Sequence, residues 1–198
     1  MDISVHDIAV EVVRTAGRDK PADQALREVL KAMRNLPPFD AAGLQSDAYL
    51  RFLVEELKPF IDAQYRTLPG REDTSVMGSS MGGLISLYAI ARRPDVFGRA
   101  AAVSTHWPAC GGCTIDWFAA HLPDRRTHRL YLDHGTATLD AGYAPYQQRM
   151  DAALRRAGWR DGRDFVTRTF DGAEHSEVAW RARAEVPLRF LLGRGDGQ

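Results

Sequence analysis

The sequence predicts an α/β fold in which a mostly parallel sheet lies between layers of helices. From residue 74 onward, short apolar segments alternate with amphipathic ones in the order strand then helix, four times over. The segment 99–104 is rich in small and branched apolar residues, which is typical of a buried parallel strand. Neither repeats nor a low-complexity linker interrupt the chain, so we expect one domain over residues 1–198.

The predicted elements follow one another closely along the chain. We expect strands at 74–77, 99–104, 129–133 and 165–170, and helices at 22–35, 46–64, 81–91, 114–122, 143–157 and 176–192. Pro59 falls inside the second helix and is expected to kink it, because proline has no amide hydrogen to donate. Residues 1–46 fit the pattern poorly, and we interpret them as a divergent or truncated N-terminal part.

Composition and charge exclude several kinds of partner. Lys and Arg together number 26 and so do Asp and Glu, which gives no electrostatic reason to expect nucleic acid or an anionic membrane. No apolar run approaches the roughly 18 residues of a membrane-spanning helix. The first residues lack the basic and then apolar pattern of a signal peptide, so a cytoplasmic location is expected.

A tight turn at residues 78–82, Gly-Ser-Ser-Met-Gly, carries the first chemical signal. It matches the pattern G-x-S-x-G, in which a serine stands exposed between a strand and a helix while the glycines let neighbouring backbone approach. Ser80 is therefore the predicted nucleophile. The amide of Met81 would lie at a helix N-terminus and could donate to an oxyanion. The alternative is a glycine-rich turn without catalytic function.

A serine hydroxyl needs a neighbouring base to act as a nucleophile. Of the six histidines, His175 lies in the loop between the last predicted strand and the last predicted helix. Such a loop opens at the carboxyl ends of the strands, where sites in α/β sheets are found. His175 is the predicted base, and a solvent-exposed or helix-capping histidine is the alternative.

Two aspartates near the third predicted strand are candidates for the acid that orients the base. Asp133 lies at the end of the strand, whereas Asp140 lies on the loop beyond it, from which it can reach across the sheet. We prefer Asp140 and keep Asp133 as the alternative acid. Asp133 could also bond turn amides.

Cys110 and Cys113 have the spacing of a thiol redox pair or of half a zinc site. A four-cysteine zinc site would need a second pair, which the sequence lacks, although His106 and His121 lie near. The simplest interpretation is a surface loop with two thiols, either reduced or bridged, and no metal is expected.

From Asp47 to about Leu192 the sequence resembles the Putative esterase family of α/β-hydrolases, which includes esterase D, feruloyl esterases, enterobactin esterases and mycolyltransferases. The resemblance rests on residues 49–62, 78–84, 132–136 and 172–176. It implies an α/β-hydrolase fold and a serine carboxylic-ester hydrolase that needs no cofactor. It also implies Ser80 as nucleophile, His175 as base and an acid a few positions beyond Gly135, which favours Asp140 over Asp133.

The N-terminal part departs from that family. Its members usually carry an antiparallel strand pair and a His-Gly or His-Asp-Gly loop that supplies a second oxyanion amide. No such segment is recognisable before residue 47, where His6-Asp7 lacks the glycine. Truncation, divergence and completion by a second copy in a homodimer therefore stay open, because an unpaired sheet edge invites pairing.

Three functions are compatible with these residues. Hydrolysis of a small-molecule ester through an acyl-enzyme is the leading hypothesis. Acyl transfer to another alcohol would use the same triad, and a catalytically impaired binding protein would explain the N-terminal departure. The loop from His106 to Cys113 is expected to overhang the site, with Trp107 as a candidate substrate contact, although Trp107 could equally be a packing residue.

Overall fold

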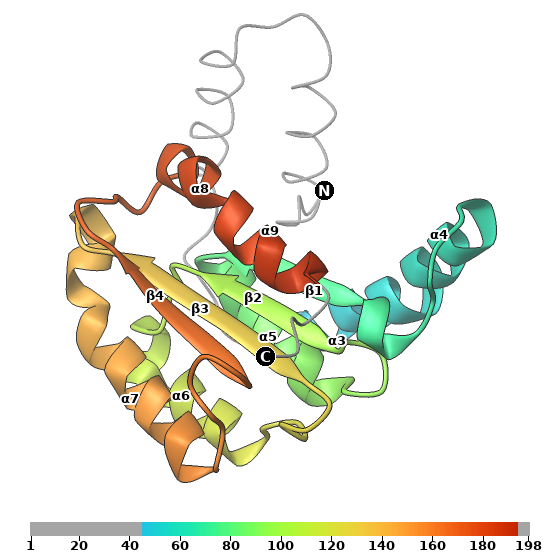
Figure 1. Cartoon of the computed structure of the whole chain (residues 1–198), viewed down its shortest axis with the longest axis horizontal. Helices are drawn as coiled ribbons and strands as arrows, with labels where there is room; N and C mark the ends of the chain where they lie inside the picture. The colour runs from blue at the N-terminus through green and yellow to red at the C-terminus, as the bar shows by residue number, and fades with distance from the viewer. Residues whose placement is uncertain (1–44, 194–198) are drawn as a thin grey trace, which may run out of the picture. The chain divides into compact units, whose positions relative to one another are not determined.

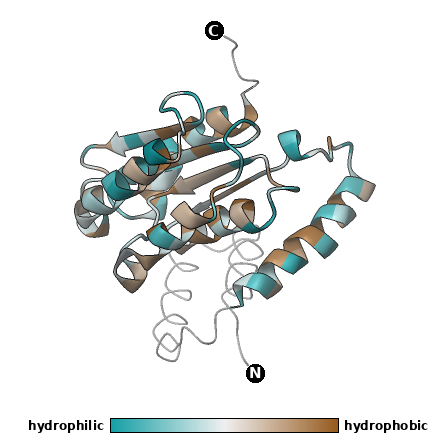
Figure 2. Ribbon diagram, turned by 90° about the horizontal axis from the view of Figure 1, so that it is seen from below, coloured by the Kyte–Doolittle hydropathy of each residue, from teal (hydrophilic) through white to brown (hydrophobic). Residues whose placement is uncertain are grey.

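The computed structural model describes residues 45–193, so the elements predicted before residue 45 lie outside it. The described part begins with α3 (Ser46–Arg51), a π-helical turn η2 (Phe52–Leu57) and α4 (Lys58–Gln64). Pro59 lies just after the π-helical turn, whose wider path accommodates a residue that cannot donate a helical hydrogen bond. Where a kink at Pro59 was expected, the structure has a π-helical turn at Phe52–Leu57, just before it. Polar and apolar stretches alternate along this helical segment (Figure 2).

Four strands form a parallel sheet in the order β1-β2-β3-β4 (Figure 1). They are β1 (Ser75–Ser79), β2 (Arg99–Val103), β3 (Arg129–Gly135) and β4 (Phe165–Phe170). The register pairs Ser79 with Val103 and Val103 with Asp133, so the carboxyl ends of these strands lie along one edge of the sheet. The prediction of a parallel α/β sheet is confirmed.

Helices and short helical turns lie before, between and after the strands. They are η3 (Arg71–Asp73), α5 (Met81–Arg92), η4 (Ala109–Gly112), α6 (Cys113–Ala120), η5 (Thr138–Gly142), α7 (Ala144–Arg156), α8 (Glu177–Arg183) and α9 (Glu185–Leu192). The single helix predicted over 176–192 is wrong, because the structure divides it at Ala184. Pro187 explains the division, since its ring nitrogen cannot donate to the carbonyl of Arg183 four residues earlier.

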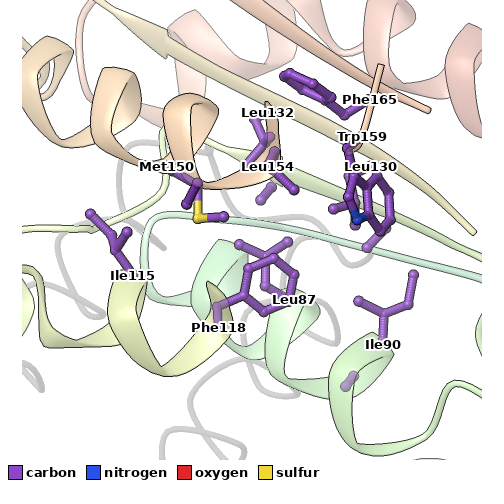
Figure 3. Close-up of a cluster of buried hydrophobic side chains, with 14 of the residues drawn as sticks. Leu87, Ile90, Ile115, Phe118, Leu130, Leu132, Met150, Leu154, Trp159 and Phe165 are labelled. Atoms are coloured by element: carbon purple, nitrogen blue, oxygen red, sulfur yellow. The ribbon is translucent and has the colours of Figure 1, made fainter. Parts of the chain in front are cut away.

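The sheet is covered on both faces, and the side chains of its strands alternate between the two. Ala100, Ala102, Leu130 and Leu132 belong to the larger cluster, which they form with residues of α5, α6 and α7 (Figure 3). Ala101 and Tyr131 face the other way and pack with Leu191 of α9. Full burial of both faces explains why the central segments 100–103 and 130–132 of these two strands are apolar. The sheet thus provides a rigid platform for the loops at its carboxyl edge.

Within residues 45–193, no helix combines the length and apolarity that crossing a membrane requires. The prediction of one domain over 1–198, and that of a divergent or truncated part at 1–46, extend beyond the described range and stay predictions.

Candidate active site

The predicted turn joins β1 directly to α5 and holds Ser80 in an unusual backbone conformation. Ser80 has φ 57° and ψ −118°, a region that L residues rarely occupy and that is sustained only by surrounding contacts. Its amide donates to the carbonyl of Val103 at 2.9 Å, and its carbonyl accepts from the amides of Gly83 and His106. These bonds anchor the turn to the end of β2, so the Ser80 side chain stands at the carboxyl edge of the sheet.

The two glycines of the pattern have different environments. A Cβ on Gly78 would lie 2.4 Å from the carbonyl oxygen of Gly82, so a side chain at 78 would push the first turn of α5 off the strand. A Cβ on Gly82 would meet nothing within 4 Å. Close backbone approach therefore requires glycine at 78 only.

His175 reaches Ser80 from the loop between β4 and α8. Its Nε2 lies 2.9 Å from Ser80 Oγ, and its side chain is largely buried. The loop is fixed to the segment after β3, because the Ala173 carbonyl accepts from the amides of Thr136 and Ala137. The His175 amide also donates to Thr138 Oγ1 at 2.8 Å. The structure thus brings together the two residues predicted as nucleophile and base.

Asp140, in η5, completes a chain of hydrogen bonds with them. Its Oδ1 lies 2.6 Å from His175 Nδ1, and its side chain is fully buried. The other oxygen, Oδ2, accepts from the Gly135 amide at 2.6 Å and from the Ser104 hydroxyl at 2.5 Å. One carboxylate oxygen is therefore held by two donors, which leaves the other to face the imidazole.

Asp133, the alternative acid, lies elsewhere. It is fully buried within β3, where it forms an ion pair with Arg183 at 3.0 Å. It also accepts from the Ser104 amide and from the Tyr131 hydroxyl. The structure thus gives Asp133 partners other than His175, because side chains alternate along a strand and position 133 faces α8. The expectation that Asp133 bonds backbone amides agrees with its contact to Ser104.

Met81 is the first residue of α5, so its amide has no acceptor within the helix. This is the position expected for an oxyanion donor, next to Ser80 and at the positive end of the helix dipole. A second donor was expected before residue 47, and residues 1–44 of that part lie outside the described residues.

Trp107 lies in the core and not over the site. It is 1% exposed, and its indole nitrogen donates to Gln147 Oε1 at 2.9 Å. A side chain with so little exposed surface cannot contact a ligand, so the structure contradicts a substrate-binding role for Trp107 and supports the packing alternative.

His106, the preceding residue, lies beside His175 instead. Its ring centroid is 6.5 Å from that of His175, and its Nδ1 is 2.6 Å from the hydroxyl of Tyr143. Burial, followed by the charge of His175, lowers the pKa of His106, while burial and the charge of Asp140 raise the pKa of Tyr143. Both groups are therefore neutral at pH 7. Tyr143 is buried, so only the half-buried His106 could reach a substrate, and it would do so without adding charge.

Sequence reasoning missed several neighbours of the three central residues. The rings of Trp180 and His175 are nearly perpendicular, with their centroids 4.8 Å apart. Ser104 and Arg183 contact the aspartates, as described above. The spacing of Trp180, one helical turn into α8, could have suggested its contact. No local pattern indicates that of Ser104 or Arg183.

Cys110 and Cys113 form a disulfide with each other. The two nearby histidines point elsewhere: His121 stacks on Trp117, and His106 bonds to Tyr143. In the described part of the chain, no group of three or more histidine, cysteine or acidic residues could hold a metal ion.

The chain is similar to several known esterases in sequence and in structure. BesA, the ferri-bacillibactin esterase of Bacillus subtilis (strain 168), is 34% identical over 64 residues, which are 31% of this chain and 22% of BesA. The enterobactin esterase FES of Shigella flexneri, determined in the presence of 2,3-dihydroxy-N-benzoyl-glycine, is similar in structure with a TM-score of 0.63 and 25% identity. That match covers 76% of this chain and 40% of FES.

A ferulic acid esterase from Anaeromyces mucronatus, in complex with ferulic acid, has a TM-score of 0.55 and 24% identity. The match covers 69% of this chain and 51% of that esterase, so the chain spans about half or less of the proteins compared here. Their shared architecture is the α/β-hydrolase fold, as predicted. The model of the family described as Putative esterase matches residues 7–185, most of the chain. The chain therefore belongs to the Putative esterase family.

Proposed function

We propose that the chain is a serine carboxylic-ester hydrolase, with Ser80 as nucleophile, His175 as general base and Asp140 as the acid that orients the base. The single observation that carries the proposal is the continuous chain of hydrogen bonds from Ser80 Oγ through His175 to Asp140. Membership of an esterase family supports the class of reaction.

The proposed reaction has two halves. Ser80 Oγ attacks the ester carbonyl while His175 Nε2 takes the hydroxyl proton, and the Met81 amide donates to the oxygen that gains negative charge. Collapse of the tetrahedral intermediate breaks the bond to the alcohol, which leaves with the proton from His175. A water molecule, activated by the same imidazole, then attacks the acyl-enzyme and releases the acid together with free Ser80.

Asp140 has a defined part in this scheme. Its Oδ1 accepts the Nδ1 proton of His175, so the lone pair of Nε2 faces Ser80. The buried carboxylate also stabilises the imidazolium that forms during the attack.

The substrates we propose are small carboxylic esters, including esters of hydroxylated aromatic acids. The two esterase structures compared above were determined with such acids. His106, half-buried, neutral and adjacent to His175, is suited to hydrogen-bond a phenolic hydroxyl, and the buried Tyr143 hydroxyl holds the His106 ring in place.

The test is covalent labelling by a fluorophosphonate probe, with turnover of p-nitrophenyl acetate and methyl ferulate measured in parallel. We expect labelling and turnover by the wild-type chain, and loss of both in Ser80→Ala and His175→Ala. Ser79→Ala is the matched control, since it removes the neighbouring hydroxyl in β1 and should keep both activities.

A wild-type chain that is neither labelled nor active would overturn the proposal, as would labelling that survives in Ser80→Ala. Labelling without net hydrolysis, together with acyl transfer to an added alcohol, would replace hydrolysis by acyl transfer through the same residues.

A further inference from the structure

We propose that Ser104 and Arg183 are positioning residues, which together orient the Asp140 carboxylate and so fix the protonation pattern of His175. The inference rests on the proposed function, since it concerns how the same site is held in a competent state. The residues involved form a buried polar cluster, in which no member is more than 5% exposed: Ser104, Asp133, Asp140 and Arg183.

Ser104 follows directly after β2 and lies between the two aspartates. Its amide donates to Asp133 Oδ1 at 3.1 Å, and its hydroxyl donates to Asp140 Oδ2 at 2.5 Å. Its φ of 42° is unusual for a residue other than glycine, and such conformations persist only where surrounding contacts hold them. The bond to Asp133 is one such contact, so the placement of the Ser104 hydroxyl depends on Asp133.

Arg183 determines which way the Ser104 proton points. Its Nη2 donates to Ser104 Oγ at 2.7 Å, and a guanidinium can only donate. The hydroxyl oxygen is thus an acceptor toward Arg183, and its own hydrogen is directed at the carboxylate of Asp140, which can only accept when ionised. The guanidinium therefore polarises the hydroxyl toward the acid.

Arg183 is itself held firmly in place. The same Nη2 donates to Asp133 Oδ1 at 3.0 Å, and the guanidinium carbon lies 4.9 Å from the centre of the Phe170 ring. Since Asp133 neutralises the buried cation, Arg183 can approach Ser104 without leaving a charge unpaired. This pairing gives a function to the aspartate that is not bonded to His175.

The consequence for His175 follows from the two oxygens of Asp140. Oδ2 is occupied by the Ser104 hydroxyl and the Gly135 amide, so Oδ1 alone is directed at His175 Nδ1. Loss of the Ser104 hydroxyl would free the carboxylate to rotate and weaken its bond to the imidazole. The proton on Nδ1, which leaves Nε2 free to act as base, would then be less firmly held.

The principal variant is Ser104→Ala, and Thr105→Val is its matched control. The Thr105 hydroxyl is also buried, but it has no hydrogen-bond partner in the described part of the chain. For Ser104→Ala we expect kcat on p-nitrophenyl acetate to fall about tenfold with KM unchanged. This is the size of effect expected when one hydrogen bond to a charged group, here the Asp140 carboxylate, is lost. Thr105→Val should keep the wild-type kcat. Circular dichroism checks that both variants are folded.

A second measurement does not depend on turnover. The low-field proton resonance of the His175 Nδ1–H, observed by NMR in the free protein, reports directly on its bond to Asp140. It should shift or broaden in Ser104→Ala and stay unchanged in Thr105→Val.

The role of Arg183 is tested by the double variant Asp133→Asn/Arg183→Met. It removes both buried charges from one protein and so leaves neither ion unpaired. We expect it to lower kcat about as much as Ser104→Ala, and the combination of all three substitutions to be no worse than either alone. If the kcat losses of Ser104→Ala and of the double variant added up in the triple variant, Arg183 would not act through Ser104.

The two hypotheses fail in different ways. An unchanged His175 resonance in Ser104→Ala, or a wild-type kcat in that variant, would overturn the positioning role. A wild-type protein without labelling or turnover, in which Ser104→Ala still alters the resonance, would overturn only the proposed function.

Discussion

Replacing Asp140 with asparagine is expected to lower kcat by about 10⁴-fold while the protein stays folded. The contacts of the carboxylate explain the size of the effect. Oδ2 accepts from two donors, the Gly135 amide and the Ser104 hydroxyl, so the amide oxygen of an asparagine would take that place. Its NH2 group would then face Nδ1 of His175.

An NH2 group cannot accept the Nδ1 proton. It would donate to Nδ1 instead, and the imidazole proton would move to Nε2, the nitrogen that lies 2.9 Å from Ser80 Oγ. The base would then have no lone pair directed at the nucleophile. A loss of about 10⁴-fold corresponds to roughly 5.5 kcal/mol of transition-state stabilisation.

Asp133→Asn is the matched comparison, because it makes the same chemical change in the neighbouring buried carboxylate. It breaks a buried ion pair with Arg183 and is expected to lower the free energy of unfolding by about 3 kcal/mol. Its kcat should stay within about tenfold of wild type, since Asp133 acts only through Ser104.

Both variants can be compared by p-nitrophenyl acetate turnover and by urea unfolding. An Asp140→Asn protein that keeps more than about a tenth of the wild-type kcat would refute the tautomer argument. If folded Asp133→Asn lost more kcat than Asp140→Asn, Asp133 and not Asp140 would be the acid.

Three further predictions concern stability and pH. Gly78→Ala should destabilise the fold, because its Cβ would lie 2.4 Å from the Gly82 carbonyl oxygen. Gly82→Ala should instead raise stability by about 0.5–1 kcal/mol, and thermal melting in the reverse order would contradict both expectations. Trp107→Ala should lower the unfolding free energy by about 3–5 kcal/mol without changing KM, because the side chain is buried, whereas a raised KM in a folded variant would indicate substrate contact. Burial and the charge of His175 lower the pKa of His106 from 6.5, so the unfolded state binds more protons below that pH and stability falls as pH falls. His106→Gln should therefore lose less stability than wild type between about pH 7 and 5, as measured by urea unfolding, and equal losses would count against this.

Local patterns in the sequence were sufficient for the fold class and indicated two of the candidate site residues. The strand at 165–170 was predicted at its observed bounds, and those at 99–104 and 129–133 to within two residues. In the latter two, the apolar segments 100–103 and 130–132 reflect burial. The turn at 78–82 indicated Ser80 through its G-x-S-x-G pattern, of which the structure requires the glycine at 78 for close backbone approach. His175 followed from its place between the last strand and the next helix.

Other features could not be read from local patterns. Pro187 divides the last helical segment, although apolar residues continue across the break and suggested one helix. Trp107 packs in the hydrophobic core, where its indole nitrogen donates to Gln147, a residue 40 positions away in the sequence. Aromatic residues in a loop beside a site give no local sign of which way they point.

The sequence by itself thus determined the parallel α/β architecture, the turn that presents Ser80 and the loop that carries His175. Only the tertiary structure decided which aspartate faces His175, and that Ser104 and Arg183 join the two aspartates. The physical reason is distance along the chain: Asp140 meets His175 across 35 positions, and Arg183 meets Ser104 across 79. Periodicity records which face of an element is buried, whereas contacts between elements depend on strand register and loop conformation, which arise only when the whole sheet is assembled.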